Sequence, residues 1–211
     1  MPKVIRINMS DLSVTESERQ DLQLLGGRAV TSKIIAEEVM PNCHPLGKYN
    51  KLVMAPSLLA GTPAPNVNRM SIGAKSPLTG TIKESNVGGM VPDKFAKLGI
   101  KALIIEGLPK DPGPYMIKIS NSGVEIVKAE NLKGLGNYNL VKEVRKVYGD
   151  EPAIISIGHR LGLRVVAEGV DTARQLEFLA SHGCDEHQSF LFSRPLYPDD
   201  FVAFLKRHTS L

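Results

Sequence analysis

The sequence has no tryptophan, only two cysteines and no long apolar run. A membrane-spanning helix needs roughly 18 consecutive apolar residues, and no stretch approaches that length. The two cysteines, Cys43 and Cys184, are too few and too far apart for a disulfide framework, which favours a reducing compartment. The N-terminus, MPKVIRINMSDLS, lacks the apolar core of a secretory signal. We therefore expect a cytoplasmic protein.

Aromatic residues and excess charge are also scarce. Aromatic side chains make up 5% of the 211 residues, and the formal net charge is only +4. Surfaces that bind nucleic acids combine clustered cations with aromatic side chains that stack on bases, and neither cluster is present. We therefore expect neither a nucleic-acid nor a membrane partner. A hydrophobic content of 42% is enough for a globular core.

The composition changes near Gly158. Residues 1–158 hold 20 Lys and Arg against 15 Asp and Glu, whereas residues 159–211 hold 6 against 7. One Phe and one His precede the change, and five Phe and four His follow it. This shift predicts a domain boundary, with one domain at 1–158 and a second at 159–211.

The first segment predicts a mixture of short strands and helices. Gly26 and Gly27 precede a helical pattern that places Val30, Ile34, Ile35 and Val39 on one face. The sequence SNSG at 120–123 is typical of a hairpin turn. We expect two further helices, at 92–98 and 140–148, and strands at 4–9, 52–55, 69–75, 101–106, 115–120 and 124–127. The predicted class is α+β with mostly antiparallel strands.

The segment between Gly61 and Gly89 is rich in Gly, Pro, Ser, Thr and Asn. Glycines let backbone N–H groups approach an anion closely, and Arg69 and Lys75 offer cations for phosphate. Asn86 can donate to and accept from the edge of a heterocycle. These residue types allow a site for a phosphorylated, nitrogen-rich cofactor, but the absence of a phosphate motif with fixed spacing favours the alternative interpretation when the residues are taken alone. The alternative is a set of tight turns in a β-rich domain, with Arg69 in a surface ion pair.

An ordered series of motifs resembles the N-terminal domain of aldehyde ferredoxin oxidoreductases, over about residues 3–158. The motifs are VIRINMS, LGGRAV, NKLVMAP, GTPAPNVNR, KSPLTG, SNVGG, FAKLGIKALIIEG and AENLKG. The resemblance implies a two-sheet domain on which a tungstopterin lies, a bis-molybdopterin group carrying tungsten or molybdenum. It implies that Arg69, Asn86 and Gly88 contact this cofactor. The parent reaction converts an aldehyde to a carboxylic acid and passes electrons to ferredoxin.

Two features depart from that family. After Ile157-Gly158 the sequence His159-Arg160-Leu161 does not continue the family pattern. The [4Fe-4S] cluster of the family needs about four cysteine ligands from later domains, and this chain has two cysteines without that spacing. We therefore expect both thiols to be inert or buried. We also expect the chain alone to be inactive, because the iron–sulfur and substrate domains would have to be supplied as partners.

Residues 153–208 resemble a different family, the EAL domains that hydrolyse cyclic di-GMP. The motifs are HRLGLRVVAEGVDT, LASHGCDEHQSFLFSRPL and FVAFLKRH. The pattern predicts a β-α-β-α fragment, with strands at 164–167 and 190–192 and helices after Thr172 and from Pro198. The resemblance implies the last two units of a TIM-like barrel. It also implies that Glu168 and Gln188 are remnants of the EAL active site.

Most of the EAL catalytic residues have no counterpart, so two-metal hydrolysis is not expected. Asp185, Glu186 and His187 are adjacent in sequence and do not predict a metal site. An incomplete barrel leaves an open strand edge, which would pair with the first domain or with a second copy in a homodimer, or stay loose. The alternatives to a tungstopterin domain are a degenerate cyclic di-GMP module and a chimeric or truncated chain without activity.

Overall fold

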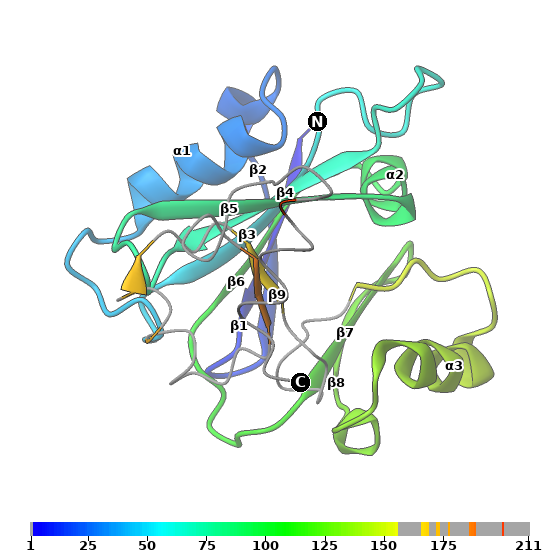
Figure 1. Ribbon diagram of the computed structural model, residues 1–211. Helices are drawn as coiled ribbons and strands as arrows, with labels where there is room; N and C mark the ends of the chain where they lie inside the picture. Colours follow the sequence, from blue (N-terminus) through cyan, green and yellow to red (C-terminus); the bar gives the residue numbers. More distant parts are fainter. Residues whose placement is uncertain are drawn as a thin grey trace. The chain divides into compact units, whose positions relative to one another are not determined.

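The computed structural model describes residues 2–155, together with 166–168, 172–173, 177, 186–188 and 200. A six-stranded sheet in the order β2-β1-β6-β3-β4-β5 organises the first part of the chain (Figure 1). Its strands are β1 (Lys3–Asn8), β2 (Ser13–Glu18), β3 (Lys51–Pro56), β4 (Arg69–Lys75), β5 (Ile82–Gly88) and β6 (Ile100–Glu106).

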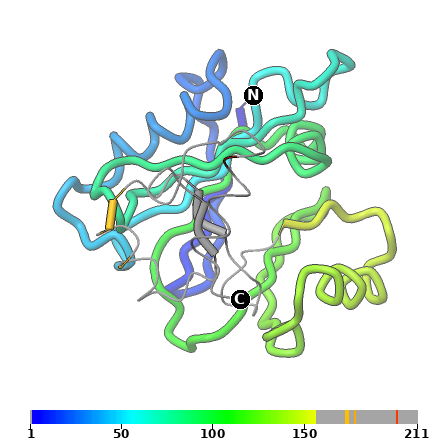
Figure 2. Tube along the Cα trace, viewed as in Figure 1, coloured from blue at the N-terminus to red at the C-terminus, as the bar shows by residue number. Residues whose placement is uncertain are grey.

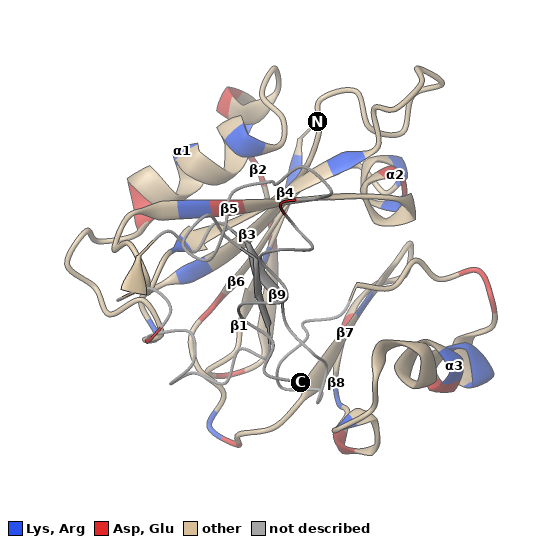
Figure 3. Cartoon of the chain, viewed as in Figure 1, with Lys and Arg blue, Asp and Glu red and all other residues tan. Residues whose placement is uncertain are grey.

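Three helices and a two-stranded hairpin accompany this sheet. The helices are α1 (Arg28–Glu38), α2 (Met90–Lys97) and α3 (Asn137–Tyr148), and the hairpin consists of β7 (Tyr115–Ser120) and β8 (Gly123–Lys128). Two 3-10 turns, Gln20–Leu22 and Glu130–Leu132, precede α1 and α3. Lys or Arg and Asp or Glu occur together on both α1 and α3 (Figure 3).

Within the six-stranded sheet, β1 and β6 are parallel and every other pair is antiparallel. These two strands are far apart in sequence and lie side by side in space (Figure 2). Because parallel strands end at the same edge, Asn8 and Glu106, the last residues of β1 and β6, are register partners. The α+β class with mostly antiparallel strands is confirmed.

Alternating side chains place one apolar layer on each face of the sheet. On the face covered by α1, Val4, Val53 and Ala102 pack against Val30 and Ile34 of the helix. The second layer is formed by buried side chains from the other face of the sheet and from α2, and partly buried residues of β7 and β8 pack against it. Its buried members are Ile5, Ile7, Met9, Met54, Met70, Phe95, Ile100 and Leu103. The predicted apolar face of α1 is therefore confirmed as a core face.

Most predicted elements agree with the structure to within one or two residues. Strands 69–75 and 115–120 have the predicted limits, and Ser120 pairs with Gly123 across the predicted hairpin turn. Helix α2 begins two residues earlier than predicted, and α3 begins three earlier.

Strands β2 and β5 were not predicted, and both lie at the edges of the six-stranded sheet. Their sequences, SVTESE and IKESNVG, contain few apolar residues, and most of their residues are exposed. Because little of either strand is buried on a sheet face, its sequence need not alternate between apolar and polar residues. The segment 61–89 is thus largely a β-hairpin rather than a loop system.

The chain divides into two compact units, residues 1–133 with 138–156 and residues 134–137 with 157–211. In the second unit, β9 (Val166–Glu168) and β10 (Glu186–Gln188) pair in parallel. Ala173, Glu177 and Asp200 are helical, within the two segments predicted to form helices. The predicted strand at 190–192 and Cys184 lie outside the described residues.

Candidate functional site

The three residues predicted to contact a cofactor lie together on the β4–β5 hairpin. Arg69 is the register partner of Gly88, and Ser71 is the register partner of Asn86. Positions two apart on a strand share a face, so these four residues lie on one face of the hairpin. We call this group the β4–β5 site. It lies on the sheet face that carries α1, because a Cβ added to Gly73 would lie 2.9 Å from Cβ of Thr31 in that helix.

The guanidinium of Arg69 is exposed, and within the described part of the chain it has no hydrogen-bond or ion-pair partner. The surface ion pair considered as an alternative is therefore not formed with any described residue. The nearest atoms to a Cβ added at Gly88 would be Cδ of Arg69 and a backbone oxygen, each at 3.7 Å. A Cβ at Gly88 would therefore be in ordinary van der Waals contact with Arg69, and the glycine leaves the backbone bare beside a cation that has no partner among the described residues.

Asn86 is exposed and is oriented by the buried Ser71, whose hydroxyl donates to Oδ1 of Asn86 at 2.8 Å. This contact occupies the amide oxygen and leaves Nδ2 available as a donor. The β4–β5 site therefore presents a guanidinium, an amide N–H₂ and a bare glycine backbone on one face. That combination suits phosphate and the polar edge of a heterocycle.

The N-terminal end of α1 borders the same face. A Cβ added to Gly27, the residue before the helix, would lie 3.4 Å from Oγ of Ser71. Glu84, two residues before Asn86 on β5, forms an ion pair of 2.6 Å with Arg28 and accepts hydrogen bonds from Thr31 and Ser32. Only 7% of the Glu84 side chain is exposed, against 71% for Arg28. Sequence reasoning missed this contact because β5 itself was missed.

Two consecutive glycines allow α1 to begin against β3. A Cβ on Gly26 would lie 2.7 Å from the Cα of Leu58, closer than real Cβ atoms come to a backbone. Gly27 has a φ of 52° and donates its N–H to the carbonyl of Pro56 at 2.8 Å. The motif LGG is therefore explained by close backbone approach and by left-handed backbone geometry.

Lys75, which was predicted as a phosphate-binding cation, has a structural role instead. It is only 8% exposed, and its ammonium donates to the backbone carbonyls of Pro41 and of Cys43, the latter at 2.7 Å. Asn50 bonds both backbone groups of Lys75, through Oδ1 and Nδ2. Lys75 thus holds the loop that follows α1, and its charge does not reach the β4–β5 site.

At the opposite end of α1, four charged residues form the ion-pair cluster Arg6, Glu38, Lys51 and Glu106. Arg6 donates to Glu38 at 2.8 Å and to Glu106 at 3.0 Å, and Lys51 pairs with both carboxylates. Burial raises the pKa of Glu106, but the hydrogen bond from Lys51 and the charges of Arg6 and Lys51 outweigh this effect and hold that pKa below its usual value. The two basic side chains of the cluster thus pair with its two acidic side chains.

The residues present fit a pterin cofactor but not an iron–sulfur cluster. The β4–β5 site supplies a cation with no partner among the described residues, an amide donor and a glycine without a side chain. Cys43 is buried, as predicted, and the only other cysteine, Cys184, is outside the described residues. In the described ranges, no three His, Cys, Asp or Glu residues gather as metal ligands, and no helix has the length and apolar character needed to cross a bilayer.

Glu168 and Gln188, the predicted EAL remnants, are the last residues of β9 and β10 and are register partners in that parallel pair. Two residues separated by 20 positions in sequence thus occupy neighbouring positions at the carboxyl ends of adjacent strands. This is the edge at which βα-barrel enzymes place their functional residues.

Comparison with known proteins agrees with both resemblances. The model of the family "Aldehyde ferredoxin oxidoreductase, N-terminal domain" matches residues 4–167, and that of the EAL domain matches residues 152–195. A cyclic di-GMP phosphodiesterase, NbdA of Pseudomonas aeruginosa, is 54% identical over 56 residues, which cover 26% of this chain and 7% of the relative.

The N-terminal match is supported by sequence and by structure. A tungsten-containing aldehyde ferredoxin oxidoreductase of Pyrococcus furiosus is 34% identical over 160 residues, covering 74% of this chain and 26% of the relative. The solved active-site complex BamBC of benzoyl coenzyme A reductase superposes with a TM-score of 0.65 at 29% identity, covering 71% of this chain and 23% of that one. The chain spans about a quarter to a third of the length of the curated oxidoreductases it matches. It belongs to the aldehyde ferredoxin oxidoreductase N-terminal domain family.

Proposed function

We propose that residues 1–158 are the tungstopterin-binding domain of an aldehyde ferredoxin oxidoreductase, and that Arg69, Asn86 and Gly88 contact the cofactor. The observation that carries the proposal is the register of β4 and β5, which places the three residues on one face with the Arg69 guanidinium unpaired among described residues. Arg69 is exposed and forms no ion pair with any described residue, so an ion pair within that part of the chain does not account for this arginine.

Each residue has a distinct role in this proposal. Arg69 binds a phosphate or pterin oxygen with its planar fork. Asn86, held by Ser71, donates Nδ2 to the pterin. Gly88 lets the cofactor approach the backbone, because a side chain there would occupy the space in front of Arg69. When bound, the tungsten or molybdenum centre supplies the two-electron chemistry that oxidises an aldehyde to a carboxylic acid.

We expect this chain alone not to pass electrons to ferredoxin. Two cysteines cannot supply the roughly four thiolates that a [4Fe-4S] cluster needs. The cluster and the substrate cavity would come from further oxidoreductase domains, which are the partners that we propose for this domain. In this proposal the chain itself binds the cofactor, and the complete oxidation of an aldehyde requires the further domains.

The test is to purify the chain from a host supplied with tungstate and molybdate and to quantify pterin and metal. The variant Gly88→Ala should fold normally, since an added Cβ has no neighbour closer than 3.7 Å, but should lose most of the bound pterin. The matched control is Ser85→Ala, which lies on the opposite face of β5. Absence of pterin from folded wild-type chain would contradict the proposal.

A second candidate concerns the C-terminal segment. The pairing of Glu168 with Gln188 at adjacent strand ends supports an EAL-derived unit that binds cyclic di-GMP without hydrolysing it. We propose that such a unit would cover its open strand edge by forming a homodimer. Calorimetric titration with cyclic di-GMP, together with the molar mass in solution, tests both points. If no heat of binding is measured and the protein is a monomer, both proposals for the C-terminal segment are wrong. The segment would then be a fragment without function, as expected of a chimeric or truncated chain.

A further inference from the structure

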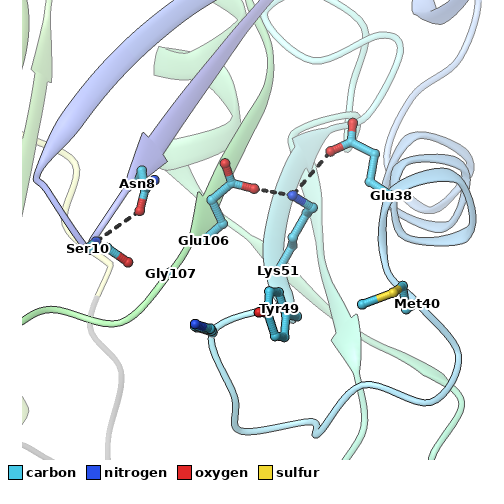
Figure 4. A pocket seen from close by; sticks show the side chains of 9 residues that line it. Asn8, Ser10, Glu38, Met40, Tyr49, Lys51, Glu106 and Gly107 are labelled. Atoms are coloured by element: carbon cyan, nitrogen blue, oxygen red, sulfur yellow. Dashed lines mark hydrogen bonds and ion pairs between the residues drawn. The ribbon is translucent and has the colours of Figure 1, made fainter.

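A cavity that shares no residue with the β4–β5 site opens where the parallel strands β1 and β6 end. Its volume is about 340 Å³, and Asn8, Ser10, Glu106 and Gly107 form the side nearest these strand ends (Figure 4). In open α/β sheets, ligands bind outside the carboxyl ends of the parallel strands, and β1 and β6 are the parallel pair of this six-stranded sheet. The cavity is also within the size range of small-molecule sites.

Gly107 allows the polar groups at these strand ends to converge. Its φ is +76°, and a Cβ at this position would lie 3.1 Å from the backbone nitrogen of Ser10 and nearer still to side-chain oxygens of Asn8 and Ser10. Any other residue would therefore be strained and would push these groups apart. The glycine thus keeps a polar wall in place beside the cavity.

The carboxylates on the cavity wall are already occupied. Lys51 lies between Glu38 and Glu106 and pairs with both, as Figure 4 shows. Arg6 forms ion pairs with the same two carboxylates. Because both carboxylates are paired with basic side chains, a ligand in the cavity would not contact a free acidic group.

The cavity lining carries several hydrogen-bond donors that have no acceptor among the described residues. Oδ1 of Asn8 accepts from the Ser10 N–H at 2.9 Å, which leaves Nδ2 to donate. Oγ of Ser10 accepts from the Leu108 N–H at 3.3 Å, which leaves its hydroxyl proton. Lys48 lies 5.0 Å from the ring centre of Tyr49, and neither the Lys48 ammonium nor the Tyr49 hydroxyl has a hydrogen-bonding or carboxylate partner among the described residues. Four donor groups, one of which is a cation without a carboxylate partner among the described residues, favour an oxyanion.

Two large side chains complete the cavity with apolar surface. Met40 is 54% exposed and Tyr49 is 57% exposed, and both line it. A flexible thioether facing an aromatic ring suits a flat, apolar body. We propose that this cavity binds a small organic carboxylate with a flat apolar body, its carboxylate bound by Lys48, Asn8 and Ser10 and its body packed between Met40 and Tyr49.

Titration of isotope-labelled chain with benzoate, followed by amide chemical shifts, tests the proposal. We expect saturable shifts at residues 8–10, 48–49 and 107, with a Kd on the order of 1 mM for a ligand of this size. Benzamide, the neutral analogue, should bind about tenfold more weakly, because it lacks the charge that Lys48 meets.

Variants separate a built site from surface association. Lys48→Met keeps the apolar stem and should weaken benzoate binding about tenfold, and Tyr49→Ala should weaken benzoate and benzamide alike. The matched control is Lys142→Met, an exposed lysine on α3 outside the cavity. Absence of saturable shifts, equal binding of benzamide, or unchanged binding by Lys48→Met would overturn the proposal. Pterin binding at the β4–β5 site is measured separately, so either proposal can fail without the other.

Discussion

The two ends of helix α1 show opposite uses of charge on one sheet face. At its C-terminal end, Arg6 and Lys51 are saturated by Glu38 and Glu106. At its N-terminal end, Arg69 stands exposed with no partner in the described residues. Neutralised charges stabilise the fold, whereas an unpaired cation beside open backbone is available to a ligand. The same face thus carries a structural cluster and a candidate binding site.

Disrupting the close contact between Gly26, just before α1, and the backbone of Leu58 should have the largest effect on stability. Gly26→Ala places a methyl group against the backbone of Leu58 and should destabilise the chain by about 3 kcal/mol. Urea unfolding measures this change as a lower midpoint. Gly88→Ala on the same face is the control and should change stability by no more than about 0.5 kcal/mol. Equal midpoints for the two variants would contradict the assigned close approach.

Removing a cation from each end sharpens the comparison. Arg6→Met leaves two half-buried carboxylates with Lys51 as their main partner and should cost about 2 kcal/mol of unfolding free energy. Arg69→Met removes an unpaired side chain and should cost no more than about 0.5 kcal/mol. Denaturant unfolding of both variants under identical conditions checks the difference. If Arg69→Met proved as destabilising as Arg6→Met, Arg69 would be a structural residue.

The contact of β5 with α1 should have an intermediate effect. Glu84→Gln keeps the shape of the side chain but removes the charge that Arg28 pairs with, and should cost about 1 kcal/mol. Hydrogen exchange should show faster opening at the start of α1 and along β5, with little change at β1. Protection that is unchanged along β5 would mean that Glu84 does not hold the strand to the helix.

The smallest expected effect is in the pH dependence of stability. The hydrogen bond from Arg19 lowers the pKa of Asp21 from 3.8 to about 2, and that of Glu106 also lies below its ordinary 4.5. Carboxyls with a lower pKa in the folded state stabilise the fold above their unfolded pKa and lose this contribution as pH falls. Stability should therefore be level above about pH 5 and decline from about pH 4.5 towards pH 2.

Arg6→Met provides the comparison for this pH profile. With Arg6 absent, the pKa of Glu106 should rise, so the decline on acidification should be shallower than in the wild-type chain. Thermal midpoints measured across the acidic range would show the change in slope. Parallel profiles would mean that Arg6 does not contribute to the lowered pKa.

Much of this fold could be predicted because its central strands are buried. Strands β1, β3 and β6 alternate or accumulate apolar residues, and the core side of α1 follows a helical period. Strands β2 and β5 could not be predicted, because their polar sequences reflect positions at the sheet edges. Such strands are specified by the partner they pair with and not by their own pattern.

Only part of the candidate site could be predicted, because β5, which carries two of its residues, was missed. Resemblance to a family predicted Arg69, Asn86 and Gly88, but only the register of β4 and β5 shows that Arg69 pairs with Gly88 and that Asn86 pairs with Ser71. Lys75 was misassigned because sequence cannot tell an exposed cation from one whose ammonium is buried against carbonyl groups. The direction of each side chain depends on strand parity, which follows once the strand is known.

The most direct test measures pterin bound per folded chain in wild type, Arg69→Met and Arg6→Met, all produced in the same tungstate-supplied host. Our account predicts that Arg69→Met keeps its stability but loses pterin, whereas Arg6→Met loses stability but keeps pterin in its folded fraction. Pterin retained by folded Arg69→Met, or lost equally from both variants, would contradict the assignment of Arg69 to ligand binding.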